Sequence, residues 1–168
     1  NLLDWSRVQT GQISYEPQNI SLNLILVSIK NLYYQKFKEK VITINFECAP
    51  DCFVFADSNM TEAILRNLIS NAIKFTPTFG SINILFDNYE NDILIKVKDT
   101  GVGMDQTQIS KLFKIDMTHS TVGTSGERGT GLGLLLSKEL IEKQGGKIWI
   151  ESVVNEGTTF YFTLPKAR

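Results

Sequence analysis

The feature that most constrains this chain is a run of alternating residues that ends in an aspartate and two glycines. Residues 93–98 have the apolar and polar pattern of a half-buried β-strand, so the sequence predicts a strand that gives way to a loop at Asp99. Gly101 and Gly103 follow, and glycine allows a close backbone approach or a positive φ at little steric cost. A carboxylate at such a place can accept hydrogen bonds from a polar group in a pocket. The alternative interpretation is a tight turn after an edge strand.

The composition is that of an ordinary globular protein and limits the classes of partner. The 168 residues include 17 Lys and Arg against 18 Asp and Glu, so the net charge is close to zero. A balanced charge argues against broad non-specific attraction to nucleic acid or to an anionic membrane surface. The length predicts one domain. No apolar run approaches the roughly 20 residues that a membrane-spanning helix needs.

The two cysteines of the sequence, Cys48 and Cys52, lie four residues apart around an Ala-Pro-Asp segment. A zinc site needs a second pair of ligands at a suitable spacing, and the sequence has no such pair. We therefore expect reduced structural thiols and a cytoplasmic compartment.

Three long segments have the apolar spacing of amphipathic helices, namely residues 22–40, 59–75 and 132–144. Ser58 is the expected N-cap of the second helix, and Thr76 should end it because the next residue is a proline. A shorter helix is expected over residues 105–113, and the last turns of another over residues 1–11.

Six segments have the composition and alternation of β-strands: residues 41–47, 53–55, 81–87, 92–98, 147–153 and 158–164. A short turn separates the first two, so we expect them to form a hairpin. Most consecutive strands are joined by short connections, which favour antiparallel pairing. The sequence predicts an α/β fold, a two-layer sandwich in which about three helices pack on a mixed, largely antiparallel sheet.

The predicted helix over residues 59–75 has a polar face formed by Asn67, Asn71 and Lys74, whose spacing brings them together. A carboxamide oxygen suits a hard cation such as Mg²⁺, and a lysine supplies a positive charge to phosphate. The pattern indicates either a place for a hydrated cation with a polyphosphate or a solvated helix face.

Gly129, Gly131 and Gly133 lie between a polar segment and the start of the predicted helix over residues 132–144. Backbone N–H groups of such a loop, together with the partial positive charge of a helix N-terminus, can bind an anion. The loop is not a Walker A motif, because no Gly-Lys-Ser/Thr follows, and it lacks the strand and spacing of a dinucleotide fingerprint. The preceding residues 114–128 are rich in Thr, Ser and Gly, and we expect a mobile loop there.

Taken in this order, four segments resemble the ATP-binding catalytic domain of two-component sensor histidine kinases, in the GHKL superfamily with its Bergerat fold. The matching segments are residues 66–76 for the N box, 99–104 for the G1 box, 129–134 for the G2 box and 156–160 for the final glycine turn. Phe113 is similar to the F box, although no clear aromatic–basic pair follows it. The resemblance implies that residues 1–16 are the end of a dimerisation helix with its linker, and that residues 17–168 are the catalytic domain.

The resemblance implies ATP and Mg²⁺ as cofactors. Asn71 would bind Mg²⁺ with Asn67 beside it, and Lys74 would contact the outer phosphates, so these three are the candidate catalytic residues. Asp99 would accept a hydrogen bond from the adenine amino group. The other candidate nucleotide-binding residues are Phe75, Gly101, Gly103, Gly129, Thr130, Gly131, Leu132, Gly133 and Thr158.

The resemblance also identifies residues 114–128 as an ATP lid, with either Lys114 or Arg128 as its cation. Related ATPases of the superfamily have a glutamate as general base four residues before the Mg²⁺-binding asparagine. Asn67 occupies that position here, so we expect poor hydrolysis. The one histidine of the sequence, His119, lies in the lid, and the phosphate acceptor is therefore expected outside this chain.

The implied function is that of a protein-histidine kinase domain, which transfers the γ-phosphoryl group of ATP to a histidine on its own dimerisation helices. The implied partners are those helices and a response regulator, with no direct contact to nucleic acid. The parent protein would be a homodimer, with or without a membrane anchor, and this chain a monomeric cytoplasmic domain. Two other interpretations stay open: a degenerate module that binds ATP without catalysis, and a GHKL ATPase or anti-sigma serine kinase.

Overall fold

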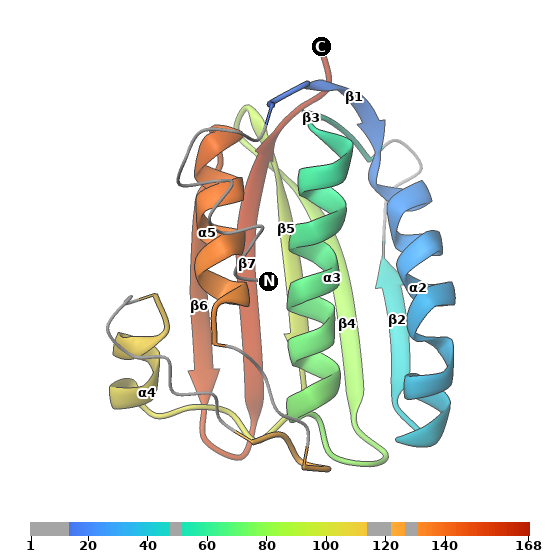
Figure 1. The fold of residues 1–168 in the computed structure, drawn as a ribbon, viewed down its shortest axis with the longest axis vertical. Coiled ribbons are helices and arrows are strands. Elements are labelled where there is room, and N and C mark those ends of the chain that lie inside the picture. The colour runs from blue at the N-terminus through green and yellow to red at the C-terminus, as the bar shows by residue number, and fades with distance from the viewer. Residues whose placement is uncertain (1–13, 48–51, 114–121, 127–130) are drawn as a thin grey trace.

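The computed structural model describes residues 14–47, 52–113, 122–126 and 131–168. Three long helices cover one face of a five-stranded sheet (Figure 1). The three long helices are α2 (Leu22–Glu39), α3 (Ser58–Phe75) and α5 (Gly133–Lys143), and a short helix, α4 (Gln106–Lys111), lies between α3 and α5 in the sequence. The sheet contains β2 (Thr43–Glu47), β4 (Ser81–Tyr89), β5 (Asp92–Asp99), β6 (Ile148–Val153) and β7 (Gly157–Pro165), while β1 (Gln18–Ser21) and β3 (Phe53–Ala56) form a separate ribbon.

The sheet has the strand order β2-β4-β5-β7-β6. The pair β2–β4 is parallel, and the other three pairs are antiparallel. Strand β4 returns beside β2 after the chain has passed through α3, which is the kind of crossover that a parallel pair requires. The predicted fold class, a two-layer arrangement with a mixed and largely antiparallel sheet, is confirmed.

The predicted hairpin between residues 41–47 and 53–55 is wrong. Strand β2 pairs with β4, with Thr43 opposite Ser81, and β3 pairs with β1, with Phe53 opposite Ser21. The short separation along the chain suggested a local turn, but each strand finds a partner that lies far away in the sequence. Strand β1 has only four residues and no alternating pattern, so nothing in the sequence indicated that β3 had a partner there.

Helix α3 lies at the centre of the helical layer, between α2 and α5 (Figure 1). Its inward stripe consists of buried aliphatic residues: Met60, Ile64, Leu65, Leu68, Ile69, Ala72 and Ile73. They belong to one core cluster with the inward residues of the central strands, Ile82, Ile84, Ile95 and Val97. Full burial of a side chain of this size contributes about 1.5–3 kcal/mol, so this stripe accounts for much of the stability of the domain.

The N-cap of α3 is Asp57, and the prediction of Ser58 is wrong by one residue. Asp57 has extended backbone dihedrals, and its Oδ1 accepts a hydrogen bond from the Met60 amide at 3.0 Å. Its Oδ2 accepts another from the Glu16 amide at 3.0 Å. A carboxylate is favoured here because the N-terminus of a helix carries partial positive charge. At the other end, Thr76 is extended and the helix stops, as expected for a residue before proline.

One expectation about the cysteines is wrong, and several others concern residues outside the described ranges. Cys52 is disulfide-bonded, so the expectation of reduced thiols is wrong for it; cysteines four residues apart in a turn can approach within the distance that a disulfide needs. The cytoplasmic expectation loses that support. Cys48, the helix expected over residues 1–11 and His119 lie outside the described residues. No helix in the described ranges is long and apolar enough to cross a membrane.

The cap at Asp57 gives a first testable prediction. The change Asp57→Ala should lower the free energy of unfolding by about 1–3 kcal/mol, because it removes the cap and leaves the buried partners of the carboxylate unpaired. Ser58→Ala is the matched control, and it should change the free energy by less than about 0.5 kcal/mol. Urea denaturation followed by circular dichroism measures both. An equal loss in the two variants would contradict the assignment of the cap.

Candidate functional site

Four elements converge at one end of the sheet, at the bottom of the molecule in Figure 1. They are the C-terminal ends of α3 and β5 and the N-terminal ends of α5 and β7. The loop after β5 is joined to α3 by a hydrogen bond of 3.2 Å from the Val102 amide to the Phe75 carbonyl. The predicted nucleotide motifs therefore meet in space: the N box, the G1 box, the start of the helix after the G2 box and the final glycine turn.

Asp99 is the most informative residue of this end. Its side chain is only 4% exposed, and its Oδ1 accepts hydrogen bonds from the Gly101 amide at 2.8 Å and the Thr158 amide at 3.2 Å. No group in the described part of the chain forms a hydrogen bond or ion pair with its Oδ2. The carboxylate is thus oriented by the backbone at Oδ1, while Oδ2 has no partner among the described residues.

Burial raises the pKa of Asp99 to about 6, although the two amide hydrogen bonds oppose that shift. Desolvation is the larger effect because a buried carboxylate loses the hydration of its charge. A buried carboxylate without a cationic partner among the described residues is costly to the fold. Such a group is more common at functional sites than in a core.

The glycines around Asp99 allow close packing of the chain against itself. A Cβ on Gly101 would lie 2.6 Å from Asp99 Oδ1 and 2.6 Å from the Phe75 carbonyl oxygen. Gly103 has a φ of +65°, which favours glycine, and a Cβ there would lie 1.9 Å from the Val153 carbonyl oxygen. Both glycines are needed to bring this loop onto its neighbours and so to shape the wall beside Asp99.

The polar face of α3 separates into two kinds of residue. The Nδ2 of Asn67 donates to Ser137 Oγ on α5 at 2.8 Å, and a Cβ on Gly133 would lie 2.2 Å from the Asn67 Oδ1. Asn67 is therefore engaged in the contact between the two helices. Asn71, one turn further along, is half-buried, and its side chain forms no hydrogen bond with any residue in the described ranges.

Lys74 and Phe75 end α3 beside this face. The Nζ of Lys74 lies 4.7 Å from the centroid of the Phe75 ring, within the range of a cation–π contact. Both side chains are half-buried. As the last two residues of α3, they lie at the same end of the sheet as Asp99, and the Lys74 ammonium adds a positive charge to that end.

Only part of the predicted glycine loop is described. Helix α5 begins at Gly133, and its N-cap residue, Leu132, makes no side-chain hydrogen bond to the first turn. The N–H groups at a helix N-terminus have no partner within the helix, which is the feature that lets such an end bind an anion. Gly131 is exposed directly before it. Gly129, Thr130 and both predicted lid cations, Lys114 and Arg128, lie outside the described residues.

Thr158 reaches the site through its backbone more than through its hydroxyl. Its amide donates to Asp99, while its Oγ1 lies 2.8 Å from Ser152 Oγ on the neighbouring strand. Ser152 Oγ also donates to the Gly157 carbonyl at 3.0 Å and accepts from the Met104 amide at 2.8 Å. Sequence reasoning missed Ser152, because its importance depends on a cross-strand register that no local pattern indicates.

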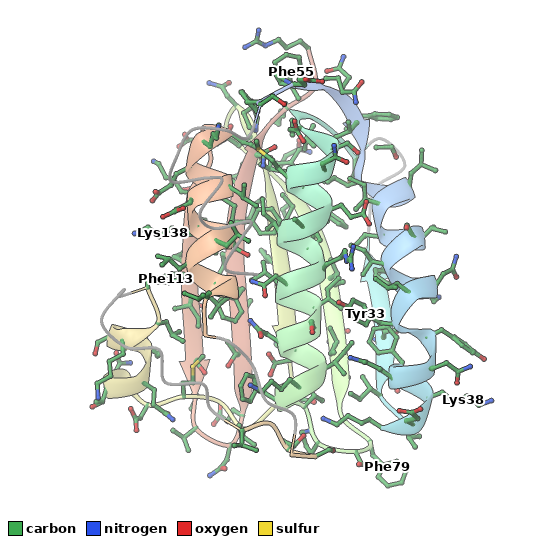
Figure 2. All side chains as sticks on the ribbon, viewed as in Figure 1. Tyr33, Lys38, Phe55, Phe79, Phe113 and Lys138 are labelled. Carbon is green, nitrogen blue, oxygen red and sulfur yellow. The ribbon has the colours of Figure 1, made fainter. Side chains whose placement is uncertain are left out.

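Phe113 lies at the outer side of α5, beyond α4 (Figure 2). The Lys138 Nζ on α5 is 5.8 Å from the centroid of its ring. The predicted F-box residue thus packs against α5 and is not one of the groups around Asp99 in the described structure.

A separate surface pocket lies at the other end of β5. Its lining residues are Asn19, Phe53, Asn88, Ile93, Lys166 and Ala167. The ionisable group among them, the Lys166 ammonium, donates to the Glu90 carbonyl at 2.6 Å. None of the residues that line the pocket is acidic, so the buried carboxylate of Asp99 favours the other end of β5 as the functional one.

The raised pKa of Asp99 predicts how stability depends on pH. The folded protein holds this proton up to about pH 6, whereas an unfolded aspartate releases it near 3.8, so the contribution of Asp99 to stability falls as pH rises from about 4 to 6. The side chain of the Asp99→Asn variant does not titrate. The free energy of unfolding of the variant relative to the wild type should therefore rise by up to about 3 kcal/mol between about pH 4 and pH 6. Urea denaturation of both proteins between pH 4 and pH 7.5 measures the difference. A difference that does not change with pH would contradict the shift.

A protein-family model, described as "Histidine kinase-, DNA gyrase B-, and HSP90-like ATPase", matches residues 56–168 of this chain. The autoinducer 2 sensor kinase/phosphatase LuxQ of Vibrio vulnificus strain YJ016 is 32% identical over 98% of this chain, which spans only 20% of that relative.

Two solved structures extend the comparison. The catalytic domain of the histidine kinase ThkA has 31% sequence identity and a TM-score of 0.78, covering 90% of this chain and 97% of its own. Full-length ShkA, solved in complex with AMPPNP, has 25% identity and a TM-score of 0.83 over 99% of this chain and 34% of its own.

Proposed function

The chain belongs to the family of histidine kinase-, DNA gyrase B- and HSP90-like ATPases, and from this premise we propose that it positions Mg·ATP for transfer of the γ-phosphoryl group to a histidine. Its fold and its relatives identify it as an ATP-binding catalytic domain of the sensor histidine kinase type. The acceptor histidine would lie on a dimerisation segment outside this chain.

The observation that carries the proposal is the half-engaged carboxylate of Asp99. Two backbone amides hold its Oδ1 and leave Oδ2 without a partner among the described residues. An adenine amino group is a neutral donor of the right kind for such an acceptor. The cost of burying this carboxylate in the free protein would be partly offset when the base donates to it. Gly101 and Gly103 bring the loop close enough to form the wall beside the base.

The residues at the end of α3 fit the phosphates and a magnesium ion. The carboxamide oxygen of Asn71 is a suitable hard ligand and is not used by another described residue. Mg²⁺ usually keeps several waters and takes few protein ligands beside phosphate oxygens, which agrees with a site built on one asparagine. When bound, the ion would neutralise phosphate charge. Lys74 would bind the outer phosphate oxygens, and the amides at Leu132 and Gly133 would donate to others.

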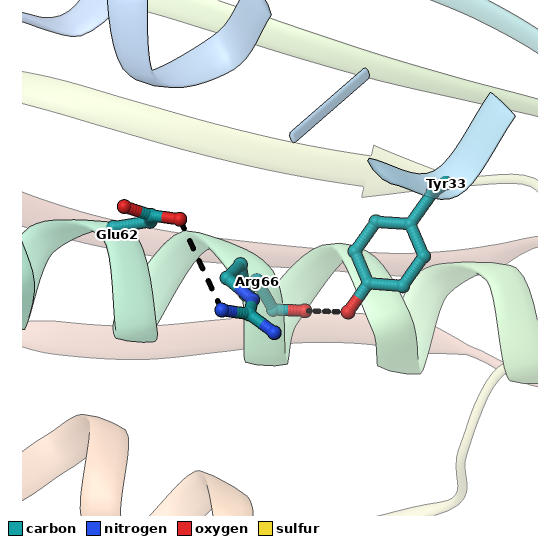
Figure 3. Close-up of polar contacts among 3 residues, drawn as sticks. All are labelled: Tyr33, Glu62 and Arg66. Atoms are coloured by element: carbon teal, nitrogen blue, oxygen red, sulfur yellow. Dashed lines mark hydrogen bonds and ion pairs between the residues drawn. The ribbon is translucent and has the colours of Figure 1, made fainter. Parts of the chain in front are cut away.

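The same helix lacks a base for hydrolysis. Asn67 occupies the position of the general base in related ATPases, and its Nδ2 is bound to Ser137. Glu62, one turn earlier, lies near Arg66 with 3.9 Å between Oε1 and Nη1, on the side where the Tyr33 hydroxyl donates to the Arg66 carbonyl (Figure 3). Neither side chain is placed to deprotonate a water at Asn71, which supports transfer to another acceptor over hydrolysis.

The surroundings of the domain are part of the same proposal. Residues 1–16 would be the end of a dimerisation helix with its linker, and residues 17–168 the catalytic domain; the Glu16–Asp57 hydrogen bond at the start of α3 supports a boundary there. The partners would be the chain's own dimerisation helices and a response regulator, in a homodimeric parent that keeps this domain in the cytoplasm. The chain alone would be a monomer without affinity for nucleic acid.

The role of Asp99 is tested by nucleotide binding. Asp99→Asn should weaken the affinity for ATP by at least about tenfold, because an amide nitrogen opposes the adenine amino group or one charged acceptor is lost. Isothermal titration calorimetry at pH 7.5 measures this. Asp87→Asn is the matched control, since Asp87 lies on the neighbouring strand in an ion pair with Lys96 and away from the site. Unchanged affinity in Asp99→Asn would overturn the assignment.

The role of Asn71 is tested by phosphoryl transfer. Asn71→Ala should reduce the rate of transfer from radiolabelled ATP to an added histidine-bearing dimerisation domain by at least about 100-fold, since the ion that neutralises phosphate charge loses its ligand. Adenine binding should persist, because Asp99 is untouched. Steady ADP release by the wild type without any acceptor would instead favour an ATPase. Binding without transfer would favour a non-catalytic ATP-sensing module.

A further inference from the structure

Lys40 is a buried lysine that ends α2 and faces the C-terminus of α3. It is 8% exposed, and its Nζ donates to the carbonyl oxygens of Ile73, Lys74 and Thr76 at 2.8, 3.3 and 3.2 Å. The last carbonyls of a helix have no partner within the helix, and they carry its partial negative charge. A buried ammonium is tolerated where several acceptors surround it. Lys40 therefore closes the end of the helix that carries the candidate phosphate-binding residues.

The fourth acceptor of Lys40 lies outside α3. Its Nζ donates to the Thr124 Oγ1 at 2.8 Å, across 84 positions of the sequence. Thr124 is itself attached to the same helix end, because its amide donates to the Lys74 carbonyl at 3.0 Å and its Oγ1 lies 3.1 Å from the Lys74 and Thr76 carbonyl oxygens. The segment Val122–Gly126, the described part of the predicted lid, is thus held on the turn that presents Lys74 and Phe75.

The ammonium has three N–H donors for these four acceptors, and its two shortest contacts, both 2.8 Å, are those to the Ile73 carbonyl and the Thr124 hydroxyl. The bond to Thr124 is thus a principal contact of Lys40 and lies outside the cap of α3. Thr124 is exposed, and neighbouring Val122 is exposed as well, so apolar burial does little to hold this segment. The side-chain contacts of Thr124 are hydrogen bonds, and they converge on Lys40 and on the carbonyls that Lys40 contacts. The Val102 amide binds the remaining carbonyl of that turn, at Phe75, and so joins the Asp99 loop to the same point.

We propose that Lys40 is a positioning residue for nucleotide binding, which fastens the Thr124 segment to the C-terminal end of α3 and so fixes the turn that carries Lys74 and Phe75. The inference rests on the proposed function, since it concerns the affinity for ATP. Lys40 acts through Thr124 and through the helix end, without touching the nucleotide.

The first test changes only the bond outside the helix. Thr124→Val keeps the shape of the side chain and removes the hydroxyl, so it should raise the dissociation constant for ATP about three- to tenfold. The urea midpoint should change little, because Lys40 keeps its three carbonyl acceptors. Thr124→Ser keeps the hydroxyl and is the matched control, with near wild-type affinity. Equal affinity of the Val and Ser variants would overturn the proposal.

The second test links the effect to Lys40. Lys40→Met removes the ammonium and keeps an unbranched chain; it should weaken binding and also lower stability. In this background Thr124→Val should have a smaller effect on the dissociation constant than in the wild type, since the bond to Lys40 is already lost and only the contacts to the Lys74 and Thr76 carbonyls remain. A purely structural role of Lys40 would leave the effect of Thr124→Val the same in both backgrounds, and that result would overturn the proposal.

Hydrogen exchange of the nucleotide-free chain separates this inference from the proposed function. The Thr124 amide should exchange faster in Lys40→Met and in Thr124→Val than in Thr124→Ser. Lack of ATP binding by the wild type would overturn the proposed function, and the exchange rates would still decide whether Lys40 anchors the segment. Equal exchange rates in all the variants would overturn the anchor itself.

Discussion

The two ends of α3 are closed by ionisable side chains, its own N-cap Asp57 and Lys40 from the end of α2, and the arrangement of the domain depends on these contacts. Asp57 accepts from the first turn, where the helix carries partial positive charge, and Lys40 donates to the last carbonyls, where it carries negative charge. Each side chain also binds a distant segment: Asp57 the Glu16 amide and Lys40 the Thr124 hydroxyl. The central helix is therefore tied to the segment before β1 at one end and to the described part of the predicted lid at the other.

The polar residues of the site divide into those used by the fold and those left for a ligand. Asn67 is bound to α5, and the hydroxyl of Thr158 is bound to Ser152, so both serve to position other groups. Asp99 Oδ2 and the Asn71 carboxamide have no such partner within the described ranges. The two open groups lie on different elements, which suits a ligand with a base at one end and phosphates at the other.

Helix α3 has no side chain placed as a base, and this favours transfer over hydrolysis. A water near the phosphates would need a carboxylate to deprotonate it, and the nearest acidic residue on the helix, Glu62, lies beside Arg66 toward α2. The domain then contributes orientation and charge neutralisation, which are the main requirements of phosphoryl transfer. The nucleophile is left to another segment.

Local patterns predicted most elements of this fold because each has a strong period or a clear stop signal. The apolar stripe of α3, the proline after Thr76 and the alternation that ends at Asp99 are all visible in short windows of sequence. The N-cap was displaced by one residue, since Asp57 and Ser58 are both good caps and only the backbone dihedrals distinguish them. The hairpin was wrong because strand partners are chosen by long-range packing and not by proximity along the chain.

The sequence by itself determined the family and the order of the matching motifs, and it predicted which residues form the site. The spacing of residues within each motif is a local property, so it can be recognised from the sequence alone. Only the tertiary structure decided which of these residues are open: it buried Asp99 with one oxygen held by backbone amides, engaged Asn67 with α5 and left Asn71 free of described partners. It also brought Lys40, Ser152 and Thr124 to the site. Their roles depend on contacts between segments far apart in the chain, which no local pattern encodes.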